Sequence, residues 1–185
     1  MAIYVKILPK SSVWGVNILI LVQLGTHELE FPRMLQLIEK CIDEGVIDEK
    51  IMVQRGNTKY QSDKMEFVEY LSYEEMEVLT KEARYIFTHG GTGSIITSIR
   101  HGKKVVAFPR LKKYNEHNDD HQEEILDMME SQEYIKVCHD GDDLVQIIKD
   151  LDNFEPKVFS SDNSKMVGIL RNFIDGIDTR YTKKR

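Results

Sequence analysis

Short apolar runs alternate along this chain with longer segments in which apolar residues recur every three or four positions. The short runs are typical of strands covered on both faces, and the longer segments are typical of amphipathic helices. Strands are therefore predicted at residues 18–22, 51–53, 65–71, 85–87, 105–108 and 134–137. Helices are predicted at residues 32–44, 72–83, 92–101, 119–130, 142–151 and 163–177.

Strands that alternate with helices predict βαβ units, and these predict a mostly parallel, Rossmann-like α/β sheet with helices on both faces. Ser72 and Glu75 have the spacing of a capping box at the start of the second helix. Ligands of such sheets bind beyond the carboxyl ends of the strands. Polar turns at 25–27, 54–56 and 89–94 follow predicted strands, so we expect them to form the binding site.

The two ends of the chain lie outside this alternation. Residues 1–17 are interrupted by a proline and are treated as an N-terminal extension without an assigned role. Residues 18–155 form the main domain, and a proline at its end marks the joint to a C-terminal element, residues 156–185. This element combines the last predicted helix with a basic tail. Its apolar stripe suits core packing or docking onto a partner subunit.

Composition narrows the class of protein. The 185 residues carry a net charge of −6, with 41% apolar and 30% charged residues, which is ordinary for a globular protein. The acidic balance disfavours broad electrostatic binding to nucleic acid. Two cysteines support neither a disulfide framework nor a cysteine zinc site, and a reducing cytoplasmic compartment is expected. The longest apolar run, residues 18–22, is far shorter than the roughly 20 residues of a membrane-spanning helix.

The sharpest motif is HGGTGS at residues 89–94, between a predicted strand and a predicted helix. Its glycines allow a ligand to approach the backbone, and a helix start offers free N–H groups and the positive end of the dipole. Thr92 and Ser94 add hydroxyl groups. The motif lacks the Gly-Lys-Ser/Thr of a P-loop, and Ile96 stands where a dinucleotide fingerprint needs glycine. It favours a phosphate or diphosphate ligand; the alternative is a tight turn without a ligand.

A second polar constellation lies at the start of the fourth predicted helix. Glu116, Asp120 and Gln122 suit sugar hydroxyl groups, because carboxylates accept hydrogen bonds and amides both donate and accept them. His117 and His121, with Asp120 beside them, are spaced i, i+4, which also suits a metal ion. However, no Glu follows His117 as H-E-x-x-H requires, and no third ligand is evident. A solvated, acidic helix start is the remaining alternative.

Three further features have both a functional and a plain interpretation. His27 is a candidate general base, since an imidazole titrates near neutral pH, or an exposed loop histidine. Arg55 would neutralise diphosphate charge or be an ordinary surface arginine. A basic cluster is expected to be a solvated face or to approach an anionic lipid surface. Its members are Lys103, Lys104, Arg110, Lys112 and Lys113.

The order of these motifs resembles a known family. The segments at 22–27, 54–56, 70–76, 88–94 and 120–122 follow one another as in the C-terminal domain of family 28 glycosyltransferases. The chain looks like the PssE-type subunits of bacterial polysaccharide glycosyltransferases. These are similar to the catalytic subunit of the two-component eukaryotic enzyme that adds the second N-acetylglucosamine to dolichyl-diphosphate sugar. The resemblance covers about residues 18–150.

The resemblance implies that residues 18–155 are a nucleotide-sugar-binding domain, the donor half of a GT-B fold. Positions that match the diphosphate-facing turns of the family are Gly25, Thr26, His89, Gly91, Thr92, Gly93 and Ser94. Positions that match its nucleotide cleft and its uracil-binding segment are Gln54, Arg55, Gly56, Leu71 and Ser72. Positions that match its donor-sugar motif are Asp120 and Gln122.

One position departs from the family pattern. The family usually has a Glu three residues after the last serine of the glycine-rich motif, where it binds the ribose hydroxyl groups. This sequence has Thr97, which makes one such contact but not the charged pair. The departure keeps open a second interpretation: a nucleotide-sugar-binding regulatory or scaffold subunit without turnover of its own.

The resemblance also implies an activity and partners. A hexose or N-acetylhexosamine would pass from a UDP-sugar to a lipid-diphosphate-linked sugar, by direct displacement with inversion, in capsule or exopolysaccharide synthesis. UDP-sugar would be the substrate, with neither cofactor nor metal, and a membrane-anchored subunit would bind the acceptor. The chain would then lie at the inner face of the membrane through this partner. The base would be His27 or a group on the partner, and a metal-dependent hydrolase built on His117 and His121 is a third hypothesis.

Overall fold

The computed structural model describes residues 19–159 and Gly168 of the chain. Its strands are β1 (Leu19–Gln23), β2 (Lys50–Gln54), β3 (Glu66–Val68), β4 (Ala83–His89), β5 (Lys104–Phe108) and β6 (Lys136–Val137). Its helices are α1 (Pro32–Asp43), α2 (Tyr73–Glu82), α3 (Thr92–Arg100), α4 (His121–Ser131) and α5 (Leu144–Leu151), with a single 3₁₀ turn, η1 (Lys112–Tyr114). These elements confirm the predicted alternation of strands and helices.

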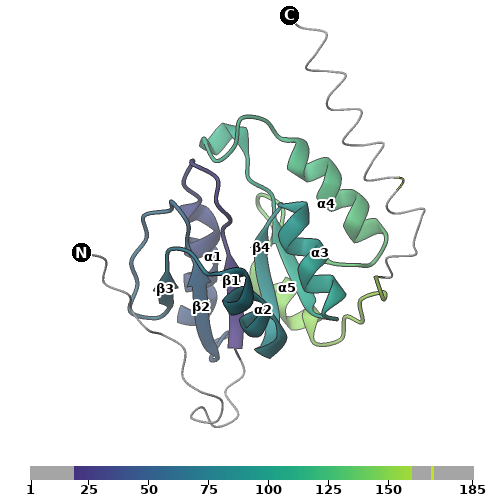
Figure 1. The fold of residues 1–185 in the computed structure, drawn as a ribbon, viewed down its shortest axis with the longest axis horizontal. Helices are drawn as coiled ribbons and strands as arrows, with labels where there is room; N and C mark the ends of the chain where they lie inside the picture. Colours follow the sequence, from purple (N-terminus) through teal and green to yellow (C-terminus); the bar gives the residue numbers. More distant parts are fainter. Residues whose placement is uncertain (1–18, 160–167, 169–185) are drawn as a thin grey trace, which may run out of the picture.

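The strands form one parallel sheet in the order β3-β2-β1-β4-β5-β6. The chain builds one side of the sheet from β1 to β3, then crosses back and builds the other side from β4 to β6. Figure 1 shows β3, β2, β1 and β4 side by side in this order. The order therefore reverses between β1 and β4. Loops leave these two strands in opposite directions, which opens a crevice at their carboxyl ends.

Two layers of helices enclose the sheet, as expected for this fold class (Figure 1). Ile20 and Val22 of β1 pack in one core with α1 and α5, where Ile38 and Ile148 are buried. Leu21 of β1 packs in a second core, to which α2, α3 and α4 contribute. Alternate residues of β1 thus point into two different cores, which explains why its apolar run is continuous.

The boundaries of several elements follow local signals in the sequence. Ser72 caps α2: its hydroxyl accepts from the Glu75 N–H at 3.2 Å, and the Glu75 carboxylate accepts from the Ser72 N–H at 2.9 Å. The predicted capping box is confirmed. The strands predicted at 65–71 and 134–137 are shorter than expected, because each pairs with a single neighbour at an edge of the sheet.

Two predictions lie outside the described residues: the N-terminal extension at 1–17, and the helix at 163–177 with its basic tail. Among the described residues, no helix has both the length and the apolar character needed to cross a membrane.

Candidate functional site

The turns that the sequence singled out meet in one open cleft of about 380 Å³ at the carboxyl ends of the strands. Nine of the predicted site residues line it: Gly25, Thr26, Gln54, Leu71, His89, Gly91, Gly93, Ser94 and Thr97. They come from the segments after β1, β3 and β4, from the last residues of β2 and β4, and from the first turns of α3. The cleft therefore lies at the crevice that the strand order predicts.

The first two turns touch through their backbones. Gly25 and Gly56 both have positive φ, +79° and +56°. A Cβ on Gly56 would lie 2.2 Å from the Gly25 carbonyl oxygen, so only glycine fits there. The Gln54 side-chain amide donates to the carbonyl oxygens of Gly25 and Glu69, each at 3.3 Å. Gly56 thus supports the site from behind, and Gln54 both lines the cleft and fixes the Gly25 turn.

His89 fills the space between the Gly25 and Gly91 turns. Its Nδ1 lies 3.2 Å from the Gln23 carbonyl oxygen, and a Cβ on Gly91 would lie 2.3 Å from its Nε2. Burial is the main cause that lowers the pKa of His89 to about 4. The ring is therefore neutral at pH 7, donates from Nδ1 to Gln23 and keeps a lone pair at Nε2.

The start of α3 opens into the cleft. Gly91 is the N-cap and has no side chain with which to cap the helix. The first N–H groups of a helix have no acceptor within the helix, and they carry the positive end of its dipole. A Cβ on Gly93 would meet nothing within 4 Å, and Gly93 and Ser94 both line the cleft. These are the features that favour an anion at the start of a helix, so the predicted phosphate ligand stays a prediction for this end of the cleft.

The other end of the cleft is aromatic and carries one carboxylate. Tyr73 of α2, 74% exposed, and Tyr70 line it together with Met76 and Glu77. Glu77 is the one carboxylate among the described residues that line the cleft. Its ion pair with Lys81, at 2.6 Å, is the main cause that lowers the pKa of Glu77, so it is ionised at neutral pH.

Sequence reasoning missed these residues, together with Gln23, whose side-chain amide lies 3.2 Å from the Met76 sulfur. A signal was present, since Tyr73, Met76 and Glu77 are spaced i, i+3, i+4 directly after the Ser72 cap. That spacing places them on one face of α2.

Several other predicted site residues do not line the cleft. The Arg55 side chain is partly exposed and forms an ion pair with Glu69 at 2.9 Å. Ser72 is occupied as the cap of α2. Asp120 is exposed, and its Oδ1 accepts from the Lys112 N–H at 2.7 Å. Thr92 stands in the first turn of α3, next to the residues that line the cleft.

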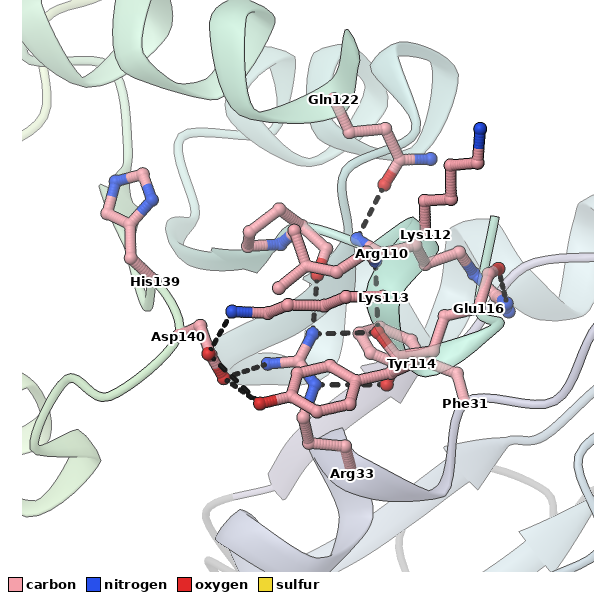
Figure 2. Close-up of polar contacts among 12 residues, drawn as sticks. Phe31, Arg33, Arg110, Lys112, Lys113, Tyr114, Glu116, Gln122, His139 and Asp140 are labelled. Atoms are coloured by element: carbon pink, nitrogen blue, oxygen red, sulfur yellow. Dashed lines mark hydrogen bonds and ion pairs between the residues drawn. The ribbon is translucent and has the colours of Figure 1, made fainter. Parts of the chain in front are cut away.

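Glu116 requires a correction. It was predicted to contact the donor sugar, but it is 2% exposed and its carboxylate is occupied within the fold. Arg33 donates to both oxygens, at 3.0 and 2.8 Å, and the Leu111 N–H donates to Oε2 at 3.0 Å. Figure 2 shows Arg33 between the carboxylates of Glu116 and Asp140. We therefore reassign Glu116 to the support of the loop after β5.

Arg110 also requires a correction, because it is not part of a solvated basic face. It is 1% exposed and donates to the carbonyl oxygens of Leu24, Leu29 and Glu116 at 2.8, 2.8 and 3.0 Å. Its guanidinium lies over the Phe31 ring, 4.8 Å from the centroid. Burial lowers the pKa of Arg110 to about 10, so it stays charged at pH 7. Arg110 ties the loop after β1 to the loop after β5.

Gln122 completes this link. Its side-chain oxygen accepts from the backbone N–H of Arg110 at 3.0 Å (Figure 2). A Cβ on Gly90 would lie 2.6 Å from the same oxygen, so α4 packs directly against the glycine-rich turn. Gln122 thus positions the turn, while its predicted contact with donor-sugar hydroxyl groups stays a prediction.

His27 lies beside the cleft rather than among the residues that line it. Its Nδ1 accepts from the Leu29 N–H at 3.1 Å, so in the neutral ring the proton lies on Nε2. Burial, followed by the neighbouring His117, lowers the pKa of His27. In this arrangement the basic nitrogen of His27 is engaged within its own turn. Its catalytic role stays a prediction.

For the metal alternative, the carboxylate that lies with the two histidines differs from the one considered in the sequence. Asp119, rather than Asp120, lies with His117 and His121, and one ligand atom from each lies within 4.8 Å of the other two. The His27 and His117 rings are 4.8 Å apart, which places this group next to the Gly25 turn.

Comparisons with known proteins agree with this geometry. The family model described as "Glycosyltransferase family 28 C-terminal domain" matches residues 19–176. The glycotransferase of kitacinnamycin is similar in structure, with a TM-score of 0.55 and 16% identity over 73% of this chain and 34% of its own. CalG4, the calicheamicin glycosyltransferase, has a TM-score of 0.54 and 13% identity over 85% of this chain and 38% of its own. This chain thus spans little more than a third of either.

The solution structure of ALG13 is similar over most of both chains. It has a TM-score of 0.51 and 16% identity, over 83% of this chain and 94% of ALG13. At these identities the likenesses show the fold, which is that of GT-B glycosyltransferases. No curated protein matches the sequence significantly.

Proposed function

The chain belongs to the glycosyltransferase family 28 C-terminal domain family, and from this premise we propose that it is the donor-binding catalytic subunit of a two-component glycosyltransferase. It moves a hexose or an N-acetylhexosamine from a UDP-sugar to a lipid-diphosphate-linked sugar, in the synthesis of a capsule or exopolysaccharide. The observation that carries the proposal is the convergence of the Gly25 turn and the start of α3 on one cleft.

The diphosphate of the donor binds at the start of α3. Free N–H groups of Thr92, Gly93 and Ser94 donate to its oxygens, and the Ser94 hydroxyl adds a further donor. The Gly25–Thr26 turn closes the opposite wall, where the absence of a side chain on Gly25 leaves room for the His89 ring, 2.6 Å from the place of a Cβ. The helix dipole stabilises the negative charge that develops on UDP as it leaves.

The nucleoside lies at the aromatic end of the cleft. The backbone at Leu71 meets the edge of uracil, and the exposed Tyr73 ring offers a face on which the base stacks. Glu77 accepts from the ribose hydroxyl groups, together with Thr97 on the neighbouring helix. The carboxylate that α3 lacks at Thr97 is thus supplied by α2.

The chemistry is a direct displacement at the anomeric carbon with inversion. The acceptor hydroxyl must lose a proton to a base as the new bond forms. His27 is poorly placed for this, because its Nδ1 is bound to the Leu29 N–H and its ring lies outside the cleft lining. We therefore place the base on the domain that binds the acceptor.

The acceptor-binding domain belongs to a membrane-anchored partner subunit. The matched residues correspond to one of the two facing domains that a GT-B enzyme needs. ALG13, a protein of similar extent, is covered over 94% of its length by this chain. Through its partner, the protein works at the inner face of the membrane.

A second function, a nucleotide-sugar-binding regulatory or scaffold subunit, is favoured by one pair of observations. Thr97 replaces the usual carboxylate, and His27 is engaged within its own turn. Both functions predict donor binding, but only the first predicts transfer.

Titration and reconstitution separate the two functions. The purified chain is titrated calorimetrically with UDP-glucose, UDP-galactose and UDP-N-acetylglucosamine, first without and then with Mg²⁺. It is then assayed for transfer with the acceptor-binding subunit and a lipid-diphosphate acceptor. Donor binding with transfer supports the catalytic subunit, and donor binding without transfer supports the regulatory one. If no UDP-sugar binds even with the partner present, both are wrong.

A further inference from the structure

His117, Asp119 and His121 form a compact group just before and at the start of α4. One ligand atom from each lies within 4.8 Å of the other two. The Asp119 Oδ1 is 3.2 Å from the His117 Nδ1 and also contacts the His121 Nδ1. The two imidazole rings are 5.0 Å apart and meet edge to face. A carboxylate oxygen therefore stands between two ring nitrogens.

The backbone holds this group in place. The Asp119 N–H points to the His117 Nδ1 at 3.4 Å, and the His121 N–H donates to the Asp119 Oδ1 at 3.3 Å. Immediately before the group, Glu116 is fixed by Arg33 and by the Leu111 N–H. The three side chains are 14%, 29% and 31% exposed for His117, Asp119 and His121. They are partly covered, and an ion from solvent still reaches them.

We propose that His117, Asp119 and His121 bind a divalent transition-metal ion, with Zn²⁺ as the preferred ion. Two imidazole nitrogens and one carboxylate oxygen are a donor set that suits Zn²⁺, whereas Mg²⁺ and Ca²⁺ prefer oxygen atoms alone. Three protein ligands leave a tetrahedral ion one position for water. The other candidate in the neighbourhood, Asp120, is bound to the Lys112 N–H.

His27 is a neighbour of this site rather than a ligand. Its ring is 4.8 Å from that of His117, but His27 does not belong to the group whose ligand atoms lie within 4.8 Å of one another. A bound ion would join the turn at 117–120 to the first residue of α4. It would thereby fix the helix that carries Gln122, which packs on the glycine-rich turn.

Zinc titration of the full chain tests the proposal without any sugar nucleotide, so its outcome is separate from that of the donor-binding proposal. The chain is freed of affinity-tag histidines and of metal with a chelator, and ZnCl₂ is added in a calorimeter. The six histidines and two cysteines of the sequence all lie between residues 27 and 139, and both cysteines are buried. We expect one Zn²⁺ per chain. Co²⁺ in place of Zn²⁺ should give the visible absorption of a four-coordinate ion.

Three variants locate the ion. His117→Ala and Asp119→Asn should each weaken Zn²⁺ binding at least about tenfold, because even changes in groups that only support a ligand cost this much. The matched control is His139→Ala, since His139 also pairs with a carboxylate, Asp127, at 3.2 Å. The Zn²⁺ affinity of the His139→Ala variant should equal that of the wild type.

Circular dichroism verifies that each variant is folded, and Zn²⁺ should raise the melting temperature of the wild type but not that of Asp119→Asn. The proposal is overturned if the wild type binds no stoichiometric Zn²⁺. It is equally overturned if folded His117→Ala and Asp119→Asn bind Zn²⁺ as tightly as the wild type.

Discussion

The two sides of the cleft region use polar residues in opposite ways. On the side of α2 and α3, Ser94 and Glu77 line an open cleft, and the first N–H groups of α3 face it. On the side of the β5 loop, Arg110 and Glu116 are almost fully buried, and their charged groups bind partners from the same chain. Polar residues thus line an open cleft in one region and hold the fold together in the other. The exposure of a residue and its partners within the chain decide which of the two roles it has. Neither can be predicted from a local sequence motif.

The largest expected effect is a loss of stability when the buried contacts of Arg110 are removed. Arg110→Met removes the donors to the Leu24, Leu29 and Glu116 carbonyl oxygens. Two buried acceptors and one partly buried acceptor lose their partners, so the free energy of unfolding should fall by about 3–5 kcal/mol in urea titration. Arg55→Met, which breaks an exposed pair with Glu69, should lower it by less than about 1 kcal/mol. Equal losses in the two variants would contradict the contrast between the two regions.

The second effect depends on pH and concerns His89. Its pKa is about 4 in the folded chain, below the value near 6.5 of an unfolded histidine. The folded state therefore disfavours the protonated ring, and the stability that comes from the neutral ring is present above pH 6.5. This stability is lost as the pH falls from about 6.5 to about 4, and it amounts to about 3 kcal/mol.

His89→Gln isolates this part of the pH dependence. Free energies of unfolding are compared between pH 7 and pH 4 for the wild type and the variant. The wild type should lose about 3 kcal/mol more than the variant, because glutamine does not titrate. Parallel pH profiles would mean that burial does not hold His89 in its neutral form.

The third effect concerns the contact between the first two turns. Gly56→Ala places a Cβ 2.2 Å from the Gly25 carbonyl oxygen. Gly45→Ala is the matched control, because Gly45 also has positive φ, +68°, but its Cβ would meet nothing within 4 Å. Gly56→Ala should cost about 1–3 kcal/mol more stability than the control and should abolish UDP binding. If Gly56→Ala still binds UDP as the control does, the Gly25 turn is not part of the site.

The smallest expected effect concerns the open cleft and tests whether Glu77 contacts the ribose. Glu77→Gln should weaken UDP binding about tenfold, since a carboxylate that accepts from ribose is worth roughly 1.5 kcal/mol or more. Binding of 2′-deoxy-UDP should change much less, which calorimetry measures directly. Lys81→Met breaks the ion pair but keeps the carboxylate, so it should leave the preference for the ribose form intact. If Glu77→Gln weakens both ligands equally, Glu77 does not contact the ribose 2′-hydroxyl.

Much of the fold was predictable because its signals are local. The apolar run of β1 and the Ser72 cap of α2 each depend on a few neighbouring residues. The edge strands β3 and β6 were predicted too long, because their length depends on pairing with a single neighbour. Convergence of the Gly25 and Gly91 turns was also predictable, since parallel strands place their carboxyl ends at one edge of the sheet.

The misassigned site residues depend on contacts between distant parts of the chain. Glu116 looks like a sugar-binding carboxylate until Arg33, 83 residues away, is seen to occupy it. Arg110 looks like part of a basic surface until its bond to the Leu24 carbonyl, 86 residues away, is seen. Asp119 was overlooked beside Asp120, because only the turn of the backbone decides which of them faces the histidines.

Binding of a diphosphate at the start of α3 is the central requirement of the proposed function. Uridine, UMP and UDP are titrated calorimetrically into the wild type and into Ser94→Ala, with Ser131→Ala on α4 as the control. We expect that UDP binds the wild type at least about tenfold more tightly than uridine, and that Ser94→Ala reduces this advantage without changing uridine binding. Equal affinities for uridine and UDP in the wild type, or an unchanged advantage in Ser94→Ala, would contradict a diphosphate site at the start of α3.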